Sequence, residues 1–129
     1  MCIFCKIIKQ EIPAHVIYED DLVLAIFDIS QVTKGHTLIM PKKHYANIYE
    51  ADDAVLERMI IVSRQLAGRL KKKFNASGIN ILNNNEPAAG QTVEHLHFHI
   101  IPRYDENDSI ICEFRPSGIN VGQVAAEWK

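Results

Sequence analysis

The stretch HLHFHIIPR, from His95 to Arg103, places three histidines at every second position. Successive side chains of a β-strand point to opposite faces, so a strand here separates the imidazoles from the apolar side chains between them. The two sets are His95, His97 and His99 on one face, and Leu96, Phe98 and Ile100 on the other. We expect the apolar face to pack in the core and the histidine face to be open to a ligand. At about 3.3 Å per residue the three imidazoles cover about 13 Å, the scale of a small polyphosphate or a nucleotide.

The chain has 129 residues, of which 47% are hydrophobic and 23% are charged. This is the usual size and composition of one globular domain with one hydrophobic core. We therefore expect a single domain over residues 1–129. Within it we place the core at residues 2–104 and an irregular tail at 105–129, with a short helix near Trp128.

Charge and hydropathy exclude several classes of partner. A net charge of −2 leaves no broad basic surface, so a nucleic acid is not an expected partner. No apolar run approaches the roughly 20 residues that span a bilayer, and Lys6 and Lys9 interrupt the apolar N-terminal stretch. Three cysteines, an odd number in a chain with no secretory signal, favour a metal site or free thiols over disulfides. The sequence therefore predicts a cytoplasmic protein that does not bind membranes.

Alternation, helical spacing and turn residues divide the chain into short strands and one long helix. The long helix is predicted from Asp52 to Phe74, because acidic residues begin it and basic residues end it, as the helix dipole favours. A short helix is predicted within residues 2–13, ending at Pro13. β-branched and aromatic runs predict five strands, at 15–19, 22–28, 36–41, 78–83 and 93–102. Tight connections and a single long helix favour an α+β fold with a five-stranded antiparallel sheet over a parallel, doubly wound sheet.

Several spaced motifs resemble those of the histidine triad family, whose signature is H-apolar-H-apolar-H-apolar-apolar. The resemblance covers most of residues 2–104, and the matching motifs are IFCKII (3–8), EIP (11–13), FDIS (27–30), GHTLIMPKKH (35–44) and GQTVEHLHFHIIPR (90–103). The chain is similar to the small nucleotide-binding members of that family. The resemblance implies a homodimer of α+β protomers whose sheets join into one, and hydrolysis or transfer of a nucleoside monophosphate group.

The resemblance makes the middle histidine, His97, the nucleophile. A neutral imidazole can attack the α-phosphorus of a nucleotide derivative and form a nucleotidyl-histidine that water then hydrolyses. Such an attack needs one ring nitrogen free, so we expect a backbone carbonyl to accept a hydrogen bond from the other. The family pattern also supplies donors for the negative charge of the transition state. These are His99, His36, Gln91 and Thr92.

The same resemblance assigns residues to the rest of the nucleotide. Asp28 of FDIS would accept hydrogen bonds from the two ribose hydroxyls, and a polar side chain seven positions before the loop glutamine falls on Asn84. Four apolar side chains are candidates for a slot around the base, with ordinary core packing as the equally open interpretation. They are Phe4, Ile7, Phe27 and Ile29. The family also implies a preference for a purine.

Cys2 and Cys5 form a Cys-x-x-Cys pair, which alone is a weak signal for zinc. Some branches of the wider family pair such cysteines with a histidine after the GH strand and with the first triad histidine, and these positions are His44 and His95. The four side chains would form a closed, structural zinc site that ties the N-terminal helix to the catalytic strand. Four uncoordinated side chains are the alternative. Cys112 is expected to be an unpaired thiol.

Two other functions stay open at this point. One is a zinc-water hydrolase with the metal on all three triad histidines, which the 13 Å spread of the row disfavours. The other is a non-catalytic nucleotide-binding dimer, whose mark would be a lost nucleophile, and His97 is present. The substrate is also open, because phosphoramidates, dinucleoside polyphosphates and aminoacyl adenylates all present an α-phosphate. Trp128 is a candidate for shaping specificity at the partner's site.

Overall fold

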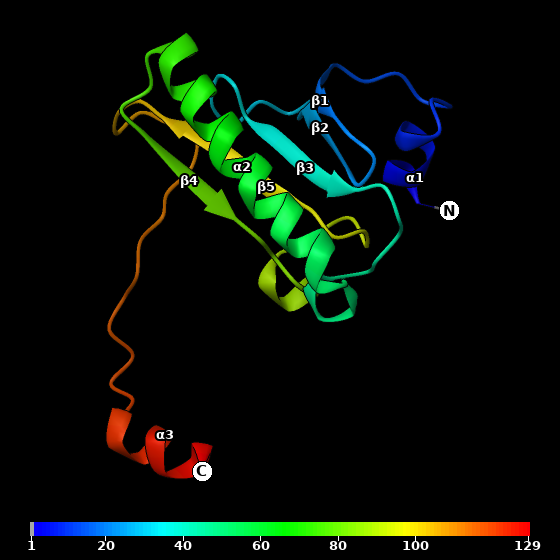
Figure 1. The fold of residues 1–129 in the computed structure, drawn as a ribbon. Helices are drawn as coiled ribbons and strands as arrows, with labels where there is room; N and C mark the ends of the chain where they lie inside the picture. Colours follow the sequence, from blue (N-terminus) through cyan, green and yellow to red (C-terminus); the bar gives the residue numbers. More distant parts are fainter. Residues whose placement is uncertain (1) are drawn as a thin grey trace.

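The structure, a computed structural model, describes residues 2–129 and is built around one five-stranded sheet (Figure 1). Every neighbouring pair of strands is antiparallel, in the order β1-β2-β3-β5-β4. The strands are β1 (Val16–Glu19), β2 (Val23–Phe27), β3 (Thr37–Pro41), β4 (Gly78–Leu82) and β5 (Phe98–Arg103). The predicted α+β fold class and antiparallel sheet are confirmed.

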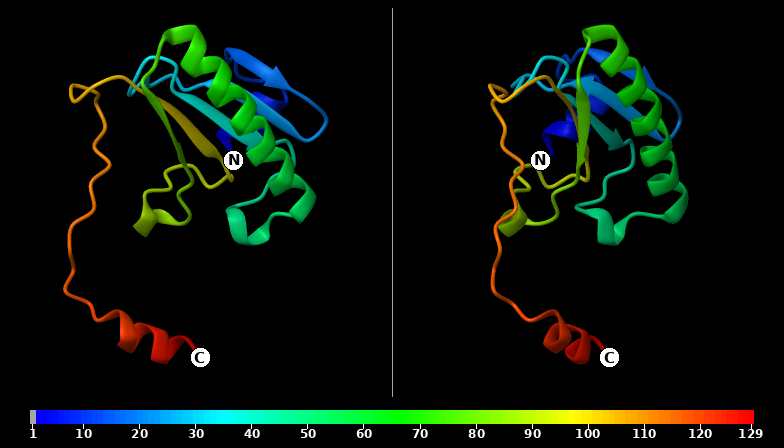
Figure 2. Two further views of the ribbon diagram at one scale, coloured as in Figure 1. Left: turned by 60° about the vertical axis from the view of Figure 1, so that its left-hand side comes forward. Right: turned by 90° about the vertical axis from the view of Figure 1, so that its left-hand side faces the viewer.

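The long helix α2 (Asp53–Phe74) covers one face of the sheet, as Figure 2 shows. Asp52 is the N-cap of α2 and Asn75 is its C-cap. The φ of Asn75 is 56°, the left-handed conformation that commonly terminates helices. Its buried side chains pack on alternate residues of β2, β3 and β5 in one cluster that forms the main core. The predicted helix from Asp52 to Phe74 is thus confirmed to within one residue.

The short helix α1 (Ile3–Ile8) covers part of the opposite face of the sheet, over β2 and β3. Phe4 is its one buried residue, and it packs with the side chains of β2 and β3 that point away from α2. The helix ends at Ile8, with Lys9 as its C-cap, before the predicted end at Pro13. It stops there because Gln10 has a φ of 64°, which a right-handed helix does not accommodate. Figure 1 shows α1 beside the β1–β2 hairpin, and the right-hand view of Figure 2 shows it across the sheet from α2.

The strand that carries the triad begins later than predicted. β5 starts at Phe98 rather than at residue 93, because residues 93–95 form a bend instead of pairing with a neighbouring strand. The alternation of faces nevertheless holds, since the three apolar residues of the motif lie in the core under α2 and the histidines point the other way. The expectation of an open histidine face is wrong for His95 and His97, which are 0% and 5% exposed, because α1 covers them.

Gly35 sets the approach to β3 and to His36. Its φ is +94°, and a Cβ there would lie 2.9 Å from the Phe74 ring and 3.2 Å from Pro102. Glycine is the residue that adopts this conformation without strain and leaves room for both neighbours. His36 is thereby brought against the sheet, where it is 4% exposed.

The C-terminal tail extends away from the sheet in Figures 1 and 2. Residues 111–129 are all exposed, and α3 (Val121–Trp128) forms near the end of the tail, as predicted around Trp128. The exposed side chains include large apolar groups, namely Ile111, Phe114, Ile119, Val121, Val124 and Trp128. Among the described residues, no helix combines the length and the apolar character that a membrane crossing requires.

Candidate active site and metal centre

His97 is held by its own backbone and by an asparagine next to β4. Its ring nitrogen Nδ1 lies 2.7 Å from the carbonyl oxygen of His95, so Nδ1–H donates and Nε2 keeps a free lone pair. The amide nitrogen of Asn83 donates to the carbonyl oxygen of His97 at 3.0 Å, and Asn85 donates to the side-chain oxygen of Asn83 at 2.6 Å. The hydrogen bond expected for a nucleophilic imidazole is present. The sequence analysis missed Asn83, whose only signal is its place in the run of asparagines after β4.

The environment of His97 favours its neutral form. Burial lowers the pKa of His97 from its ordinary value, against the opposing effects of the hydrogen bond to His95 and of the Asp28 carboxylate. The ring of Phe4 meets the His97 ring edge-on, with 5.0 Å between ring centroids. At neutral pH the imidazole is therefore uncharged, with Nε2 available for attack.

His99 and His36 form a second pair beside the nucleophile. His36 Nδ1 lies 3.1 Å from the carbonyl oxygen of Ser30 and donates to it, so His36 Nε2 accepts from Nδ1–H of His99 at 2.9 Å. Asp28 adds a carboxylate oxygen 3.7 Å from His36 Nε2. Burial lowers the pKa of His99 to about 4, with neighbouring His97 and His36 adding to the effect. In the neutral pair, His99 presents Nε2 as an acceptor.

A pocket of about 960 Å³ opens between α1, the end of β2 and the triad. Eight of the side chains proposed for nucleotide binding or catalysis line it: Phe4, Ile7, Phe27, Asp28, Ile29, Thr92, His97 and His99. Ile29 is fully exposed at its mouth, whereas Phe4 is buried at its floor. The sequence-based selection of these residues therefore describes one continuous cavity.

The other candidates lie outside the lining of this pocket. The Gln91 amide nitrogen donates to the carbonyl oxygens of Ala46 at 2.6 Å and Val93 at 3.0 Å, and its oxygen accepts from the backbone of Glu86. Gln91 thus anchors the loop, and the structure does not leave its amide free for a phosphate. Asn84 makes only a long contact of 3.5 Å to Gly90. His36 is buried and contacts the pocket only indirectly, because its Nε2 accepts from Nδ1–H of His99, which lines the pocket.

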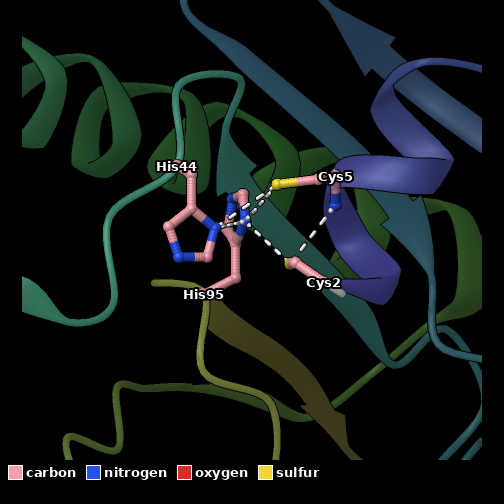
Figure 3. Close-up of side chains that lie close together, drawn as sticks. All are labelled: Cys2, Cys5, His44 and His95. Atoms are coloured by element: carbon pink, nitrogen blue, oxygen red, sulfur yellow. Dashed lines mark hydrogen bonds between the residues drawn. The ribbon is translucent and has the colours of Figure 1, made fainter.

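The first triad histidine faces a different cluster, drawn in Figure 3. His95 Nδ1 lies 3.3 Å from Cys2 Sγ, 3.6 Å from Cys5 Sγ and 3.1 Å from His44 Nδ1. Cys5 Sγ also lies 3.3 Å from His44 Nδ1. The four predicted metal ligands therefore converge, with all four donor atoms within 4.8 Å of one another. His95 contacts the cysteine cluster, whereas His99 contacts His36. This arrangement does not support a single zinc ion bound by all three triad histidines.

The donor set fits a tetrahedral zinc ion. Bonds of about 2.3 Å to sulfur and about 2.0 Å to nitrogen separate the ligands of such an ion by about 3.3 to 3.8 Å. The contacts in the cluster, between 3.1 and 3.6 Å, are close to this range. His95 Nε2 donates to the carbonyl oxygen of Pro41 at 2.9 Å, which directs the unprotonated Nδ1 at the cluster as zinc-binding histidines require. Burial lowers the pKa of His95 to about 4, so the ring is neutral and able to bind a metal.

Comparison with known proteins places this geometry in a family. The model of the HIT domain matches residues 9–106. The chain belongs to the HIT domain family. Among relatives of this HIT protein, the Protein hit of Bacillus subtilis is 50% identical over 107 residues, covering 83% of this chain and 74% of that protein. The crystal structure of a HIT family protein from Bacillus anthracis matches with a TM-score of 0.92 and 43% identity, covering 98% of this chain and 92% of that one.

Two further relatives have names that describe an activity or a metal. The adenosine 5'-monophosphoramidase HNT1 of Saccharomyces cerevisiae is 40% identical over 110 residues, covering 85% of this chain and 67% of that protein. A zinc-bound histidine triad family protein from Mycobacterium smegmatis has a crystal structure that matches with a TM-score of 0.79 and 31% identity, covering 98% of this chain and 96% of that one. The family assignment and the expected HIT fold are thus confirmed.

Proposed function

We propose that this HIT protein hydrolyses or transfers the nucleoside monophosphate group of an adenosine nucleotide derivative through a covalent nucleotidyl-His97 intermediate. One observation carries the proposal: the 2.7 Å hydrogen bond from His97 Nδ1 to the His95 carbonyl leaves a neutral Nε2 lone pair on a residue that lines the pocket. An imidazole in this state is a nucleophile that needs no further proton transfer to attack.

The reaction then takes two displacements. In the first, the His97 Nε2 lone pair forms a bond to the α-phosphorus, the bond from phosphorus to the leaving group breaks, and the leaving group takes a proton. In the second, a water oxygen attacks the same phosphorus, the phosphorus–nitrogen bond breaks, and Nε2 regains its lone pair while the water loses a proton. Transfer to another acceptor follows when that acceptor replaces the water.

The transition state needs donors for its phosphate oxygens, and we assign this role to two pocket residues. The hydroxyl of Thr92 is exposed at the pocket wall. His99 Nδ1–H already donates to His36 Nε2. His99 therefore donates to a phosphate oxygen through Nε2–H when the His36–His99 pair takes up a proton. A bound phosphate brings negative charge beside this pair and so favours its protonated form. His36 and Asp28 then stabilise the charge from behind.

The adenosine part of the ligand is assigned to the mouth of the pocket. Asp28 uses one carboxylate oxygen to accept from the Ser30 backbone at 2.7 Å, which leaves the other to accept from a ribose hydroxyl. The apolar side chains of α1 and the end of β2 would enclose the base, and a purine offers them the larger face. The name of the yeast relative supports an adenosine phosphoramidate as the first substrate to test. Dinucleoside polyphosphates present the same α-phosphate and are the second.

We further propose one structural zinc ion per chain, held by Cys2, Cys5, His44 and His95. The converging donor atoms and the similarity to the zinc-bound histidine triad family protein from Mycobacterium smegmatis support it. When bound, such an ion supplies no chemistry to the phosphate; it crosslinks α1 to the segment that precedes β5. Because Phe4 of α1 contacts both His95 and His97, this crosslink also fixes one wall of the nucleotide pocket.

We also propose a homodimer in which the tail of each protomer lies against its partner. The tail exposes Phe114 completely and leaves Trp128 89% exposed, which is unusual for side chains of this size. The edge strand β4 exposes Ile81 and Leu82 as well, and its outer edge is free to continue the sheet across the dimer. A purine nucleotide and a second copy of the chain are therefore the expected partners.

The function is tested by steady-state hydrolysis of adenosine 5'-monophosphoramidate and of diadenosine polyphosphates, with guanosine and cytidine analogues as the comparison for the base. The proposal predicts release of AMP, with kcat/KM higher for purines than for cytidine. His99→Gln is expected to lower kcat about 100-fold, since removal of one transition-state donor costs roughly that much. Absence of turnover with every one of these compounds would leave nucleotide binding alone as the function.

A further inference from the structure

A second group of metal-binding side chains lies apart from the cysteine cluster. The carboxylate of Asp28 after β2, the imidazole of His36 before β3 and that of His99 on β5 bring one ligand atom each within 4.8 Å of one another. His36 is buried, and Asp28 and His99 line the nucleotide pocket. The three side chains come from separate segments. Backbone groups of Ser30 hold Asp28 and His36 in place, and His36 in turn contacts the His99 ring.

The hydrogen bonds in this group leave two acceptor atoms close to each other. His36 Nδ1 donates to the Ser30 carbonyl, so His36 Nε2 carries a lone pair, which accepts from His99 Nδ1–H. Asp28 Oδ1 accepts from the Ser30 backbone, while Asp28 Oδ2 receives no hydrogen bond from residues 2–129 and lies 3.7 Å from His36 Nε2. The one proton between these groups is that of His99 Nδ1. A cation would be stabilised by both acceptors.

The spacing and chemistry of the group fit a first-row transition metal. Neighbouring ligands at about 2.1 Å from an octahedral ion lie about 3.0 Å apart. His36 Nε2 and His99 Nδ1 are 2.9 Å apart, while Asp28 Oδ2 lies 3.7 Å from His36 Nε2 and would have to move closer on binding. Two imidazoles with one carboxylate favour borderline cations such as Ni²⁺, Co²⁺ and Zn²⁺ over Mg²⁺ or Ca²⁺. His99 can ligate through Nδ1 by moving its proton to Nε2, which costs no change in charge.

We propose that Asp28, His36 and His99 form a second metal site, which binds a divalent transition-metal ion on the pocket side and excludes the nucleotide. The metal would exclude the nucleotide because it would bind the Asp28 carboxylate oxygen that is assigned to the ribose. It would also bind His99, which would then no longer contact the phosphate. Metal binding at this site does not depend on the proposed function. The competition between the metal and a nucleoside does rest on the proposed function.

Isothermal titration of the zinc-loaded protein with Ni²⁺ tests the site. The wild type is expected to bind one Ni²⁺ beyond its zinc, and Asp28→Asn is expected to raise the Kd at least about tenfold. The matched control is Asp21→Asn, which removes an exposed carboxylate from the hairpin turn and should leave the Kd unchanged. His99→Gln, monitored by circular dichroism for folding, should weaken binding as well. Absence of extra Ni²⁺ binding, or equal binding by wild type and Asp28→Asn, would overturn the proposal.

Competition is measured with adenosine, which has no phosphate to bind Ni²⁺ in solution. Saturating adenosine should raise the Kd for Ni²⁺, and saturating Ni²⁺ should raise that for adenosine by the same factor. Simultaneous binding of both without mutual effect would overturn the exclusion. If the protein binds Ni²⁺ at this site but no adenosine or AMP, the proposed function fails and the metal site stands.

Discussion

The ring nitrogen Nδ1 of His97 lies 2.7 Å from the carbonyl oxygen of His95, two residues before it. This single contact fixes which nitrogen of the middle triad histidine carries the proton. It also links two sites, because the His95 side chain belongs to the cysteine cluster while its carbonyl orients the nucleophile. A change at the cluster can therefore alter the position of His97 without touching the nucleotide.

Asn83 is predicted to position the nucleophile from the other side. Its amide donates to the His97 carbonyl at 3.0 Å, and Asn83→Ala leaves that carbonyl without the donor. We expect kcat to fall about tenfold or more, because small misplacements of a reacting group are costly. Asn107→Ala is the matched control, since Asn107 is exposed in the turn after β5 and lies outside the residues assigned to the site. Steady-state kinetics of both variants check this, and an equal or larger loss in Asn107→Ala than in Asn83→Ala would contradict it.

Removal of one cysteine of the cluster is predicted to abolish binding of the proposed zinc ion. Cys5→Ser should lower the zinc content from one ion per chain to well below half and reduce Tm by several degrees, because a structural zinc site contributes directly to folding. Cys112→Ser is the control, as Cys112 is exposed and distant from the cluster in sequence. Elemental analysis and differential scanning calorimetry give the two readouts. Full zinc content in Cys5→Ser would show that other ligands suffice.

The hairpin turn contains a carboxylate, that of Asp20, which accepts four hydrogen bonds. Burial alone would raise the pKa of Asp20, but hydrogen bonds from Tyr18, from the backbone of Leu22 and Val23, and from Arg58 outweigh it and hold the pKa well below its usual range. A carboxyl whose pKa is lower in the folded state stabilises the fold above its unfolded pKa, near 4, and loses that contribution as the pH falls further.

Asp20→Asn is therefore expected to lower the free energy of unfolding by about 2 kcal/mol at pH 7, the size of a hydrogen bond to a charged group. The difference from the wild type should narrow as the pH falls below about 4. Urea unfolding at a series of pH values measures it, with the exposed neighbour Asp21→Asn as the control. A difference that does not change with pH would rule out the charge of Asp20 as the cause.

The single tryptophan reports on the proposed dimer. Trp128 is 89% exposed in the isolated protomer, so its fluorescence should be red-shifted at high dilution. We predict a blue shift as the protein concentration rises, in parallel with dimer formation in sedimentation experiments. Phe114→Ser should move both transitions to higher concentration, because Phe114 is fully exposed in the same tail. A dimer whose tryptophan emission stays red-shifted would place the interface elsewhere.

Local patterns in the sequence were enough for the fold, and the family resemblance selected most of the residues that line the pocket. The helix from Asp52 to Phe74 and the alternation around His97 follow from spacing alone, and the structure confirms both. The family resemblance selected the four cluster ligands, which the structure brings together although His44 and His95 are 51 positions apart. These features depend on periodicity or on a motif that is visible in the chain itself.

Features that depend on tertiary contacts were not predictable in this way. The cover over His95 and His97 comes from Phe4, and nothing in the local sequence indicates that α1 crosses the sheet there. The Gln91 amide matched the family pattern but is bound to the carbonyls of Ala46 and Val93. The pairing of Arg58 with Asp20 joins residues 38 positions apart, with no motif to mark it.

Intact-protein mass spectrometry detects the proposed nucleotidyl-His97 intermediate directly. Wild-type protein and His97→Ala are mixed with adenosine 5'-monophosphoramidate for times shorter than one turnover and quenched without acid, because a phosphorus–nitrogen bond to histidine is acid-labile. Nucleotidyl transfer through His97 predicts one added AMP group on the wild type and none on His97→Ala. Turnover by the wild type with no adduct, or an adduct that persists on His97→Ala, would contradict nucleotidyl transfer through His97.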